Sequence, residues 1–340
     1  MLRIAIDAMG GDNAPHEIVK GALAGARRHG VQLVLVGPLE RVEAELAKNS
    51  TDGVEFTMMH SEDYIAMRER PIPAVKVKPR ASIVVACQLV KDGVADAVVT
   101  MGHTGAAVVA SLWTWGRIEG IKRAAVGMPF FTIQPETFLL DAGANIDCKA
   151  EYLLQFGLMG SLYAEKVMGI PNPTVGLLSN GEEENKGNRT VMEAFPLLKN
   201  SGLNFVGNVE GRHIAYGTVN VVVSDGFVGN VLVKLTEGLV RQFATVVTEQ
   251  LETSLPPEIM NSVVQPVLRG FAHDNHYSRW GGMPLLGVNG ICVIGHGRSR
   301  ADAVVSAIGQ AKSAVEIDLI SAIAEGWKEL TARKSLLNAL

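Results

Sequence analysis

The chain contains few cysteines, and they are not arranged to form a metal site. Cys87, Cys148 and Cys292 are the three cysteines among 340 residues, and no C-x-x-C pair occurs. Without paired histidine and cysteine ligands we expect no structural zinc, and nothing specifies magnesium at the aspartates that end the expected strands. Because the first expected strand begins at Arg3 with no secretory signal before it, we expect a reduced, cytoplasmic protein.

Three further absences narrow the class of protein. No stretch approaches ~18 uninterrupted apolar residues, so we expect no membrane-spanning helix. The net charge of −4 argues against nucleic acid as the main partner. No G-x-G-x-x-G follows the first expected strand, and no G-x-x-x-x-G-K-[ST] loop occurs. We therefore expect no cofactor, and an NAD-dependent decarboxylating dehydrogenase is disfavoured.

Glycine, in contrast, is abundant, with 36 residues. Short runs rich in Val, Ile and Leu that end in a glycine-rich loop predict strands buried in a parallel sheet. The loops after such strands lie at the carboxyl edge of the sheet, where open α/β folds bind ligands and where helix starts favour an anion. Six segments have this pattern, and each opens a helical pattern: Ile4–Asp12, Ala97–Gly105, Phe138–Asn145, Val175–Gly181, Val221–Asn230 and Ile291–Gly297.

The alternation of strand, loop and helix continues almost to the end of the chain without a clear linker. We therefore expect one α/β domain over residues 1–340. One stretch, at about 236–268, interrupts the alternation: an amphipathic helix over Thr236–Thr253, then Pro256-Pro257, then a shorter apolar arm over Ile259–Leu268. An added helical hairpin of this kind serves oligomerisation, or a membrane or partner contact.

Two of the loops present glycines together with side-chain donors. Gly102 and Gly105 allow the backbone to approach a ligand, and His103 and Thr104 between them offer hydrogen bonds. For Gly10 and Gly11 a tight strand-to-helix turn is the alternative to a role in ligand binding.

The segment Asn180–Arg189 is the most unusual. The acidic run after Gly181 is typical of a solvated surface. Lys186, however, lies just before a helix that Asn188 can cap. A lysine at a helix N-terminus is unfavourable unless an anion joins it, which is the argument for a phosphate partner.

Two later loops add candidates of the same kind. Asp225 and Gly226 follow the apolar run at 221–223, and Asn230 can bind an oxyanion. Arg298, in the loop at 295–299, can bind phosphate through two hydrogen bonds. Cys148 is the cysteine outside an expected element, but no histidine lies near it in sequence to activate it as a nucleophile.

In this order, the motifs resemble the bacterial phosphate acyltransferases of phospholipid synthesis, the PlsX family, over nearly the whole chain. Each motif is weak alone, and nine in series are specific. They are Asp7–Asp12, Gly102–Ala106, Leu140–Asn145, Leu178–Glu183, Lys186–Asn188, Gly207–Gly211, Asp225–Asn230, Tyr277–Gly282 and Leu286–Gly290. Two departures occur: relatives usually carry Asn at the position of His103, and a basic stretch ending Asp-Ser-Ser where Lys78–Ser82 stands here.

The resemblance implies a three-layer α/β/α sandwich with a mostly parallel sheet, similar to phosphotransacetylases and to isocitrate and isopropylmalate dehydrogenases. It implies a homodimer that transfers a long-chain acyl group from acyl carrier protein to orthophosphate, giving acyl-phosphate for phospholipid synthesis. It also places the hairpin at the exposed tip of the dimer, so that residues 259–268 contact a membrane peripherally. The alternatives are a phosphotransacetylase using acyl-coenzyme A and a non-catalytic membrane-surface scaffold.

The expected chemistry uses phosphate itself as the nucleophile. Lys186 and Arg298, with the loop N–H groups, hold phosphate; Asn230 or Thr104 stabilises the oxyanion; and Asp225 orients phosphate or takes its proton. A basic cluster in a short loop, at Arg68, Arg70, Lys76, Lys78 and Arg80, is expected to dock the acidic carrier protein, or else is a solvated loop.

Overall fold

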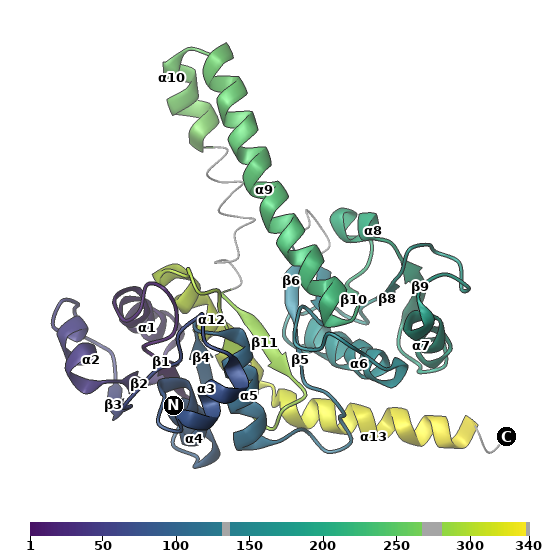
Figure 1. Ribbon diagram of the computed structural model, residues 1–340, viewed down its shortest axis with the longest axis horizontal. Helices are drawn as coiled ribbons and strands as arrows, with labels where there is room; N and C mark the ends of the chain where they lie inside the picture. Colours follow the sequence, from purple (N-terminus) through teal and green to yellow (C-terminus); the bar gives the residue numbers. More distant parts are fainter. Residues whose placement is uncertain (131–136, 267–280, 338–340) are drawn as a thin grey trace.

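Two β-sheets with helices packed on them form the body of the molecule, and a long helical projection rises from it (Figure 1). The structure is a computed structural model that describes residues 1–130, 137–266 and 281–337. The first sheet has seven strands in the order β3-β2-β1-β4-β12-β11-β5, and the second has five in the order β6-β7-β10-β8-β9.

The amino-terminal part of the chain builds most of the first sheet. The pairs β1–β2, β1–β4, β2–β3 and β4–β12 are parallel, as expected for strands joined by crossover helices. The elements are β1 (Arg3–Asp7), α1 (His16–His29), β2 (Gln32–Gly37), α2 (Leu39–Leu46), β3 (Phe56–His60), α3 (Pro71–Val77), α4 (Ser82–Lys91), β4 (Ala97–Thr100), α5 (Thr104–Trp115) and β5 (Ala125–Val126).

The central strands are apolar throughout because both faces of the sheet are buried. In β1, Ile4 and Ile6 belong to one hydrophobic cluster and Ala5 to another on the opposite face. Helices α1 and α12 pack together on the first face, and α4 and α5 cover the second. Helix α1 ends at Gly30, whose φ of 63° is the left-handed conformation that terminates a helix at little cost.

The middle of the chain forms the second sheet. Helix α6 covers one face, and the beginning of α9 approaches the other. The elements are β6 (Met128–Phe130), β7 (Thr137–Leu140), α6 (Ala150–Lys166), β8 (Val175–Leu178), α7 (Arg189–Lys199), β9 (Phe205–Val209), α8 (Gly211–Tyr216) and β10 (Val221–Val223).

The carboxyl-terminal part returns to the first sheet and then crosses back. β11 (Met283–Leu286) and β12 (Ile291–Ile294) complete the first sheet, α12 (Ala301–Glu316) packs on it, and α13 (Leu319–Leu337) packs on α6 of the second. One hydrophobic cluster contains buried residues of both sheets, including Ile4 and Phe138. The two sheets therefore share a core.

The α/β class predicted from the sequence is confirmed, and the sheet is divided in two. All six predicted apolar runs are strands (β1, β4, β7, β8, β10 and β12), and each is followed by a helix. Their distribution was not predicted: β1, β4 and β12 lie side by side in the first sheet, whereas β7, β10 and β8 lie side by side in the second. The loops therefore form two groups.

The projection is a helical hairpin, but its first helix begins earlier than predicted. Helix α9 runs from Gly226 to Ser254, so the predicted start at Thr236 was wrong by ten residues. The Asp225 side chain caps it, accepting a 2.8 Å hydrogen bond from the Val228 amide. The second arm contains α10 (Pro257–Ile259) and a π-helical turn (Met260–Val264), and its predicted end at 267–268 lies outside the described residues, as does most of the motif at 277–282. Among the helices of the described ranges, none is long and apolar enough to cross a membrane.

Candidate functional site

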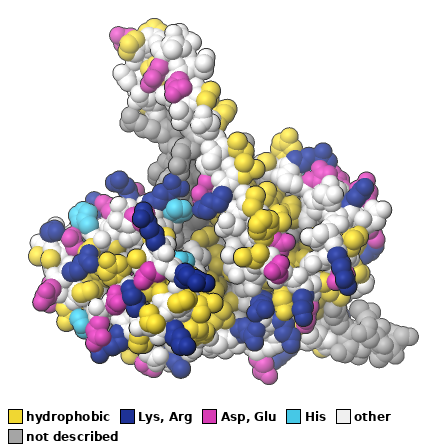
Figure 2. All heavy atoms as spheres, viewed as in Figure 1, with side chains coloured by type: hydrophobic (Ala, Val, Ile, Leu, Met, Phe, Trp, Pro, Cys, Tyr) yellow, Lys and Arg dark blue, Asp and Glu magenta, His cyan; other side chains and the backbone are white. Residues whose placement is uncertain are grey.

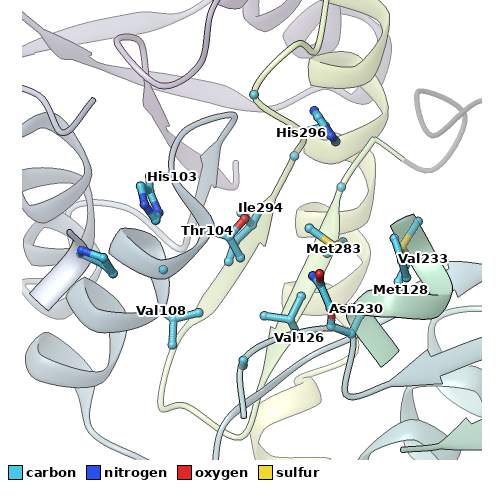
Figure 3. A pocket seen from close by; sticks show the side chains of 18 of the residues that line it. His103, Thr104, Val108, Val126, Met128, Asn230, Val233, Met283, Ile294 and His296 are labelled. Atoms are coloured by element: carbon cyan, nitrogen blue, oxygen red, sulfur yellow. The ribbon is translucent and has the colours of Figure 1, made fainter. Parts of the chain in front are cut away.

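A cleft between the two sheets is lined by four of the predicted site residues, His103, Thr104, Gly105 and Asn230. It is a cavity of about 610 Å³, within the usual range for small-molecule sites. Figure 3 shows His103, just before α5, and Thr104, at its start, on one side of the cleft, and Asn230 and Val233 of α9 on the other side. Most of its wall is apolar, formed by residues such as Val108, Val126, Met128, Val233, Met283 and Ile294.

Gly10 and Gly11, in the loop after β1, are explained by neighbouring atoms that leave no room for a side chain. A Cβ at Gly10 would lie 2.7 Å from the Asp7 carboxylate and the Thr100 hydroxyl, and one at Gly11 would lie 2.8 Å from the carbonyl oxygen of Met101. Gly11 also has a φ of 99°. The tight-turn alternative therefore accounts for both glycines. Gly102 lies beside them, and Gly105 lines the cleft.

Asn230 is held in the cleft by the loop at 141–145. Its Nδ2 donates a 3.3 Å hydrogen bond to the carbonyl oxygen of Ala142 and lies 2.8 Å from where a Cβ of Gly143 would be. The loop is organised by Asp141, which is fully buried and accepts hydrogen bonds from the amides of Val126, Gly143, Ala144 and Asn145 and from the Asn145 side chain.

Burial raises the pKa of Asp141, although these hydrogen bonds oppose the shift. The sequence predicted the loop at 141–145 as one of the strand-to-helix loops but did not single out the carboxylate of Asp141. An aspartate directly after a buried strand, followed by small residues, was the available signal.

Charged side chains gather at the rim of the cleft. Glu237 accepts ionic contacts from both sides, at 3.4 Å from Lys234 Nζ and 3.6 Å from Arg298 Nη2. Two cations therefore share the carboxylate of Glu237 at the rim. Arg298 was predicted as a site residue; Lys234 was not, and it is exposed and lines the cleft.

His296 is a cleft residue that the sequence interpretation passed over in favour of Arg298. Its Nδ1 accepts a hydrogen bond from the Arg298 amide at 3.3 Å. Burial first, and then the nearby charges of Arg298 and Lys234, lower the pKa of His296. The ring is therefore neutral at pH 7. The glycines on both sides of His296 in sequence were the signal for its loop position.

The remaining predicted residues form a second group at the carboxyl ends of β8 and β10. A separate cavity of about 540 Å³ is lined by Asn180, Asp225 and Asn188. The Asn180 side chain accepts a 2.8 Å hydrogen bond from the Gly187 amide, and Asn188 caps α7 as predicted, accepting from the Val191 amide at 2.9 Å. The structure thus brings Asn180, Gly181, Lys186, Asp225 and Gly226 together, but apart from the cleft.

The loop at 141–145 and the start of α9 separate the two cavities. Gly226 donates its amide to the carbonyl oxygen of Asn145 at 2.7 Å, and a Cβ at this position would lie 2.8 Å from the Asp141 carboxylate. On α9, Val228 and Leu232 face the second cavity, whereas Asn230 and Val233 face the cleft.

Lys186 lines neither cavity, yet it differs from the cations of α7 and α8 that pair with the glutamates of its loop. Glu182 pairs with Arg212, and Glu184 pairs with Lys199. For Lys186, no acidic partner is recorded within the described ranges, although it stands among three glutamates and is exposed. Its charge is available to an anion.

Among the residues that the structure describes, we find neither a reactive cysteine nor a metal centre. Burial, followed by the charges of Asp141 and Asp225, raises the pKa of Cys148 to about 12, so its thiol remains protonated. Cys87 and Cys292 are buried. No cluster of three or more potential metal-binding side chains is found in the part of the chain that the structure describes.

Comparison of the fold defines the class of protein first. A phosphotransacetylase from Streptococcus pyogenes has a similar structure, with a TM-score of 0.62 at 17% sequence identity, over 92% of this chain and 94% of that one. At this identity the likeness concerns the fold alone: an α/β architecture that phosphotransacetylases share.

Sequence comparison then gives the family. The model of the family described as "Fatty acid synthesis protein" matches residues 2–322. A phosphate acyltransferase of Pelotomaculum thermopropionicum is 49% identical over 322 residues, covering 95% of this chain and 94% of that protein. One of Desulforamulus reducens is 46% identical, covering 96% and 97%. The chain belongs to this family of fatty acid synthesis proteins. Its similarity to the two phosphate acyltransferases shows that it is an acyltransferase.

Proposed function

We propose that the protein transfers a long-chain acyl group from acyl carrier protein to orthophosphate, releasing acyl-phosphate for phospholipid synthesis. The observation that carries the proposal is the cleft itself: about 610 Å³, mostly apolar, with a cationic rim. An apolar wall gains ~0.8 kcal/mol for each CH₂ group that it buries, which favours long chains. The rim supplies charge for the anion.

The proposed chemistry divides the predicted residues between the two cavities. In the cleft, Asn230 and Thr104 stabilise the oxyanion while Arg298 holds phosphate. Beside the second cavity, exposed Lys186 first attracts phosphate, and Asp225 orients it there before it passes to Arg298 at the rim of the cleft. Gly10, Gly11, Gly102, Gly105, Gly181 and Gly226 permit the backbone approaches, and His103 and Asn180 contribute hydrogen bonds. No cofactor or metal has a part in this scheme.

The donor is tested by comparing thioesters. Purified protein is given phosphate with either palmitoyl-acyl carrier protein or palmitoyl-coenzyme A, and acyl-phosphate is trapped with hydroxylamine. We expect higher kcat/KM for the carrier-protein thioester. Preference for the coenzyme A thioester would establish the alternative, a phosphotransacetylase-like enzyme, and absence of phosphate-dependent acyl transfer from both would refute the proposal.

A basic surface beside the cleft mouth is the proposed docking site for the acidic carrier protein. Met67, Pro71 and Ile72 line the cleft. The exposed Arg68, Arg70 and Lys76 lie in the same segment of the chain. Figure 2 shows lysine and arginine side chains beside the hollow between the two parts of the body.

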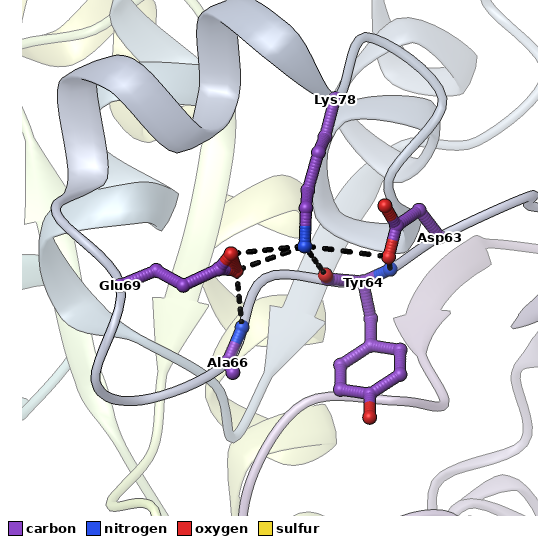
Figure 4. A network of polar contacts seen from close by, with 5 residues as sticks. All are labelled: Asp63, Tyr64, Ala66, Glu69 and Lys78. Carbon is purple, nitrogen blue, oxygen red and sulfur yellow. Dashed lines mark hydrogen bonds and ion pairs between the residues drawn. The ribbon is translucent and has the colours of Figure 1, made fainter.

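Two residues of the predicted basic cluster are already neutralised. Lys78 contacts Glu69 at 2.9 Å and Asp63 at 3.5 Å (Figure 4), and Arg80 contacts Glu62 at 2.8 Å. Hydrogen bonding to Glu69 raises the pKa of Lys78 and lowers that of Glu69, so the pair orders the loop. This leaves Arg68, Arg70 and Lys76 as the docking charges.

A homodimer is proposed from the exposed face of α9. Phe227, Val231, Leu235, Leu239 and Phe243 recur every four residues and are 51–63% exposed. Such spacing forms one continuous apolar stripe, and a projecting helix does not keep such a stripe in water without a partner. The occupant that fits is the same stripe of a second copy. Leu239→Asp with Phe243→Asp should convert the dimer to monomers in sedimentation; an unchanged mass would refute this interface.

The tip of the hairpin is the proposed peripheral membrane contact of this cytoplasmic enzyme. Ile259 and Val263 are exposed, whereas Met260 is buried. An exposed apolar face without many cations predicts weak, reversible binding. Replacing Ile259 and Val263 by Asp should release the protein from sedimented vesicles and leave an active dimer. If the variant becomes monomeric, the face belongs to the dimer interface and the membrane proposal fails.

A further inference from the structure

Behind the ring of His103 lies a second, much smaller chamber. It has a volume of about 10 Å³, and its wall includes Asp7, Ser82, Thr100 and His103. Among the described residues, His103 is the one that lines both this chamber and the cleft. A volume of roughly 10–15 Å³ admits about one water molecule where polar groups surround it. The chamber can therefore link His103 to the end of β1.

Asp7 is the acidic residue of the chamber wall, and it is 2% exposed. Its Oδ2 accepts a 2.7 Å hydrogen bond from the Thr100 hydroxyl, and its Oδ1 accepts one from the Met9 amide at 3.3 Å. Thr100 in turn accepts the Gly102 amide at 3.0 Å, which ties the loop of His103 to this carboxylate. Burial raises the pKa of Asp7, and a hydrogen bond with Ser82 is the first of those that oppose the shift.

The other titratable groups beside Asp7 are neutral. Burial raises the pKa of Cys87 well above its ordinary value and that of Cys292 to about 12, and the charge of Asp7 adds to both shifts. Tyr64 completes the chamber wall. Asp7 shares the chamber with the hydroxyl groups of Tyr64, Ser82 and Thr100 and with the ring of His103, which is the one imidazole in the described wall.

His103 has one enclosed ring nitrogen. It precedes α5 directly, and its Nδ1 is buried without a hydrogen-bond partner within the described ranges. Leaving such a nitrogen unpaired is costly. In a neutral imidazole one nitrogen donates and the other accepts, and the hydrogen bond made by the first determines the role of the second.

We propose that one water in the chamber joins the Asp7 carboxylate to the Nδ1–H of His103, which leaves Nε2 as a proton acceptor toward the cleft. Asp7 is then a positioning residue, and His103 is the group that carries a proton during acyl transfer. This inference rests on the proposed function. It applies the logic by which a buried carboxylate fixes the tautomer of a catalytic histidine, here through a water.

A carrier of this kind fits the proton balance of the reaction. An oxygen of hydrogen phosphate forms a bond to the thioester carbonyl carbon, and the carbon–sulfur bond breaks as the intermediate collapses. The proton of hydrogen phosphate passes to Nε2 of His103 and then to the departing sulfur, which leaves as a thiol. Acyl-phosphate dianion and thiol result from hydrogen phosphate dianion and thioester, so no further reactant is required.

The tautomer of His103 is the direct test, and it does not depend on activity. Protein labelled with ¹⁵N-histidine is measured without substrate by long-range ¹H–¹⁵N correlation, with His103 assigned by its loss in His103→Asn. We expect the Nδ1–H form in the wild type and a shift toward Nε2–H in Asp7→Asn. Asp12→Asn, which removes the same charge from the same loop outside the chamber, should leave the tautomer unchanged. An Nε2–H wild type would overturn the proposal, even if Asp7→Asn failed to fold.

Kinetics give the second test. Asp7→Asn should lower kcat at least tenfold and change the phosphate KM less than twofold, because ground-state binding is retained. When Asp7→Asn is added to His103→Asn, kcat should fall less than threefold further, because the proton carrier is already absent. Additive losses would overturn the role of Asp7. If the wild type transfers no acyl group to phosphate, the proposed function fails, and the tautomer still decides whether the chamber link exists.

Discussion

Lys186→Ala is the substitution that most directly tests the phosphate site. Lys186 lies near the end of the loop that leads into α7, two residues before the cap Asn188, and is exposed. The neighbouring acidic side chains Glu182 and Glu184 are paired with Arg212 and Lys199. Within the described ranges, Lys186 forms no ion pair with these or other acidic side chains. Its charge can therefore interact with an anionic substrate.

The magnitude follows from Coulomb's law. Two unit charges ~4 Å apart interact by about 1 kcal/mol in water and about 4 kcal/mol at an effective dielectric constant of ~20. Because Lys186 is exposed, the lower of these two interaction energies applies. The second negative charge of a phosphate dianion roughly doubles that energy. A loss of ~1.4–2 kcal/mol corresponds to a tenfold to thirtyfold reduction in kcat/KM for phosphate.

The assay is the phosphate dependence of acyl-phosphate formation at low and high salt. Lys199→Ala is the matched control, because Lys199 is an exposed lysine whose charge is already paired with Glu184. We expect the loss for Lys186→Ala to shrink at high salt and the control to stay within twofold of the wild type. Equal kinetics of the two variants, with unchanged melting temperatures, would remove Lys186 from the site.

Three further predictions concern other parts of the molecule. Cys148→Ser should retain substantial activity because burial keeps this thiol protonated, and a labelled acyl-protein at Cys148 would refute direct attack by phosphate. Neutralising Arg68, Arg70 and Lys76 should raise KM for the carrier-protein thioester in a salt-sensitive manner while sparing a small thioester; equal loss with both would indicate damage to folding or phosphate binding. The lowered pKa of His296 means that the unfolded chain binds its proton more readily, so stability is lost as pH falls below about 6.5. His296→Gln should flatten the melting temperature between pH 7 and 5, and an unchanged slope would contradict this.

The strand–loop–helix order was predictable because it rests on local pattern. Apolar runs such as Val221–Val223 end in glycine or aspartate, and each is a buried strand in the structure. Asn188 was predictable as a helix cap for the same reason: its hydrogen bond to the Val191 amide lies within one turn.

The grouping of the loops could not be predicted, because the sheet to which a strand belongs depends on long-range pairing. Residues of the loops after β4 and β12 meet in the cleft, while those after β8 and β10 meet at the second cavity. From sequence alone Lys186 and Asn230 were assigned to one site. Asn230 reaches the cleft only because α9 turns it away from Asp225, which faces the other cavity.

Helix α9 connects the candidate site to the tip, and its length limits how the tip can serve the reaction. Asn230, Val233, Lys234 and Glu237 line the cleft, whereas the hairpin turns after Ser254. At ~1.5 Å per residue, the tip lies on the order of 30 Å from the cleft. A membrane contact at Ile259 and Val263 therefore does not bring the cleft to the bilayer surface. The proposed contact acts by holding the enzyme close to the membrane, so that acyl-phosphate is released near the lipid into which it partitions rather than directly within it.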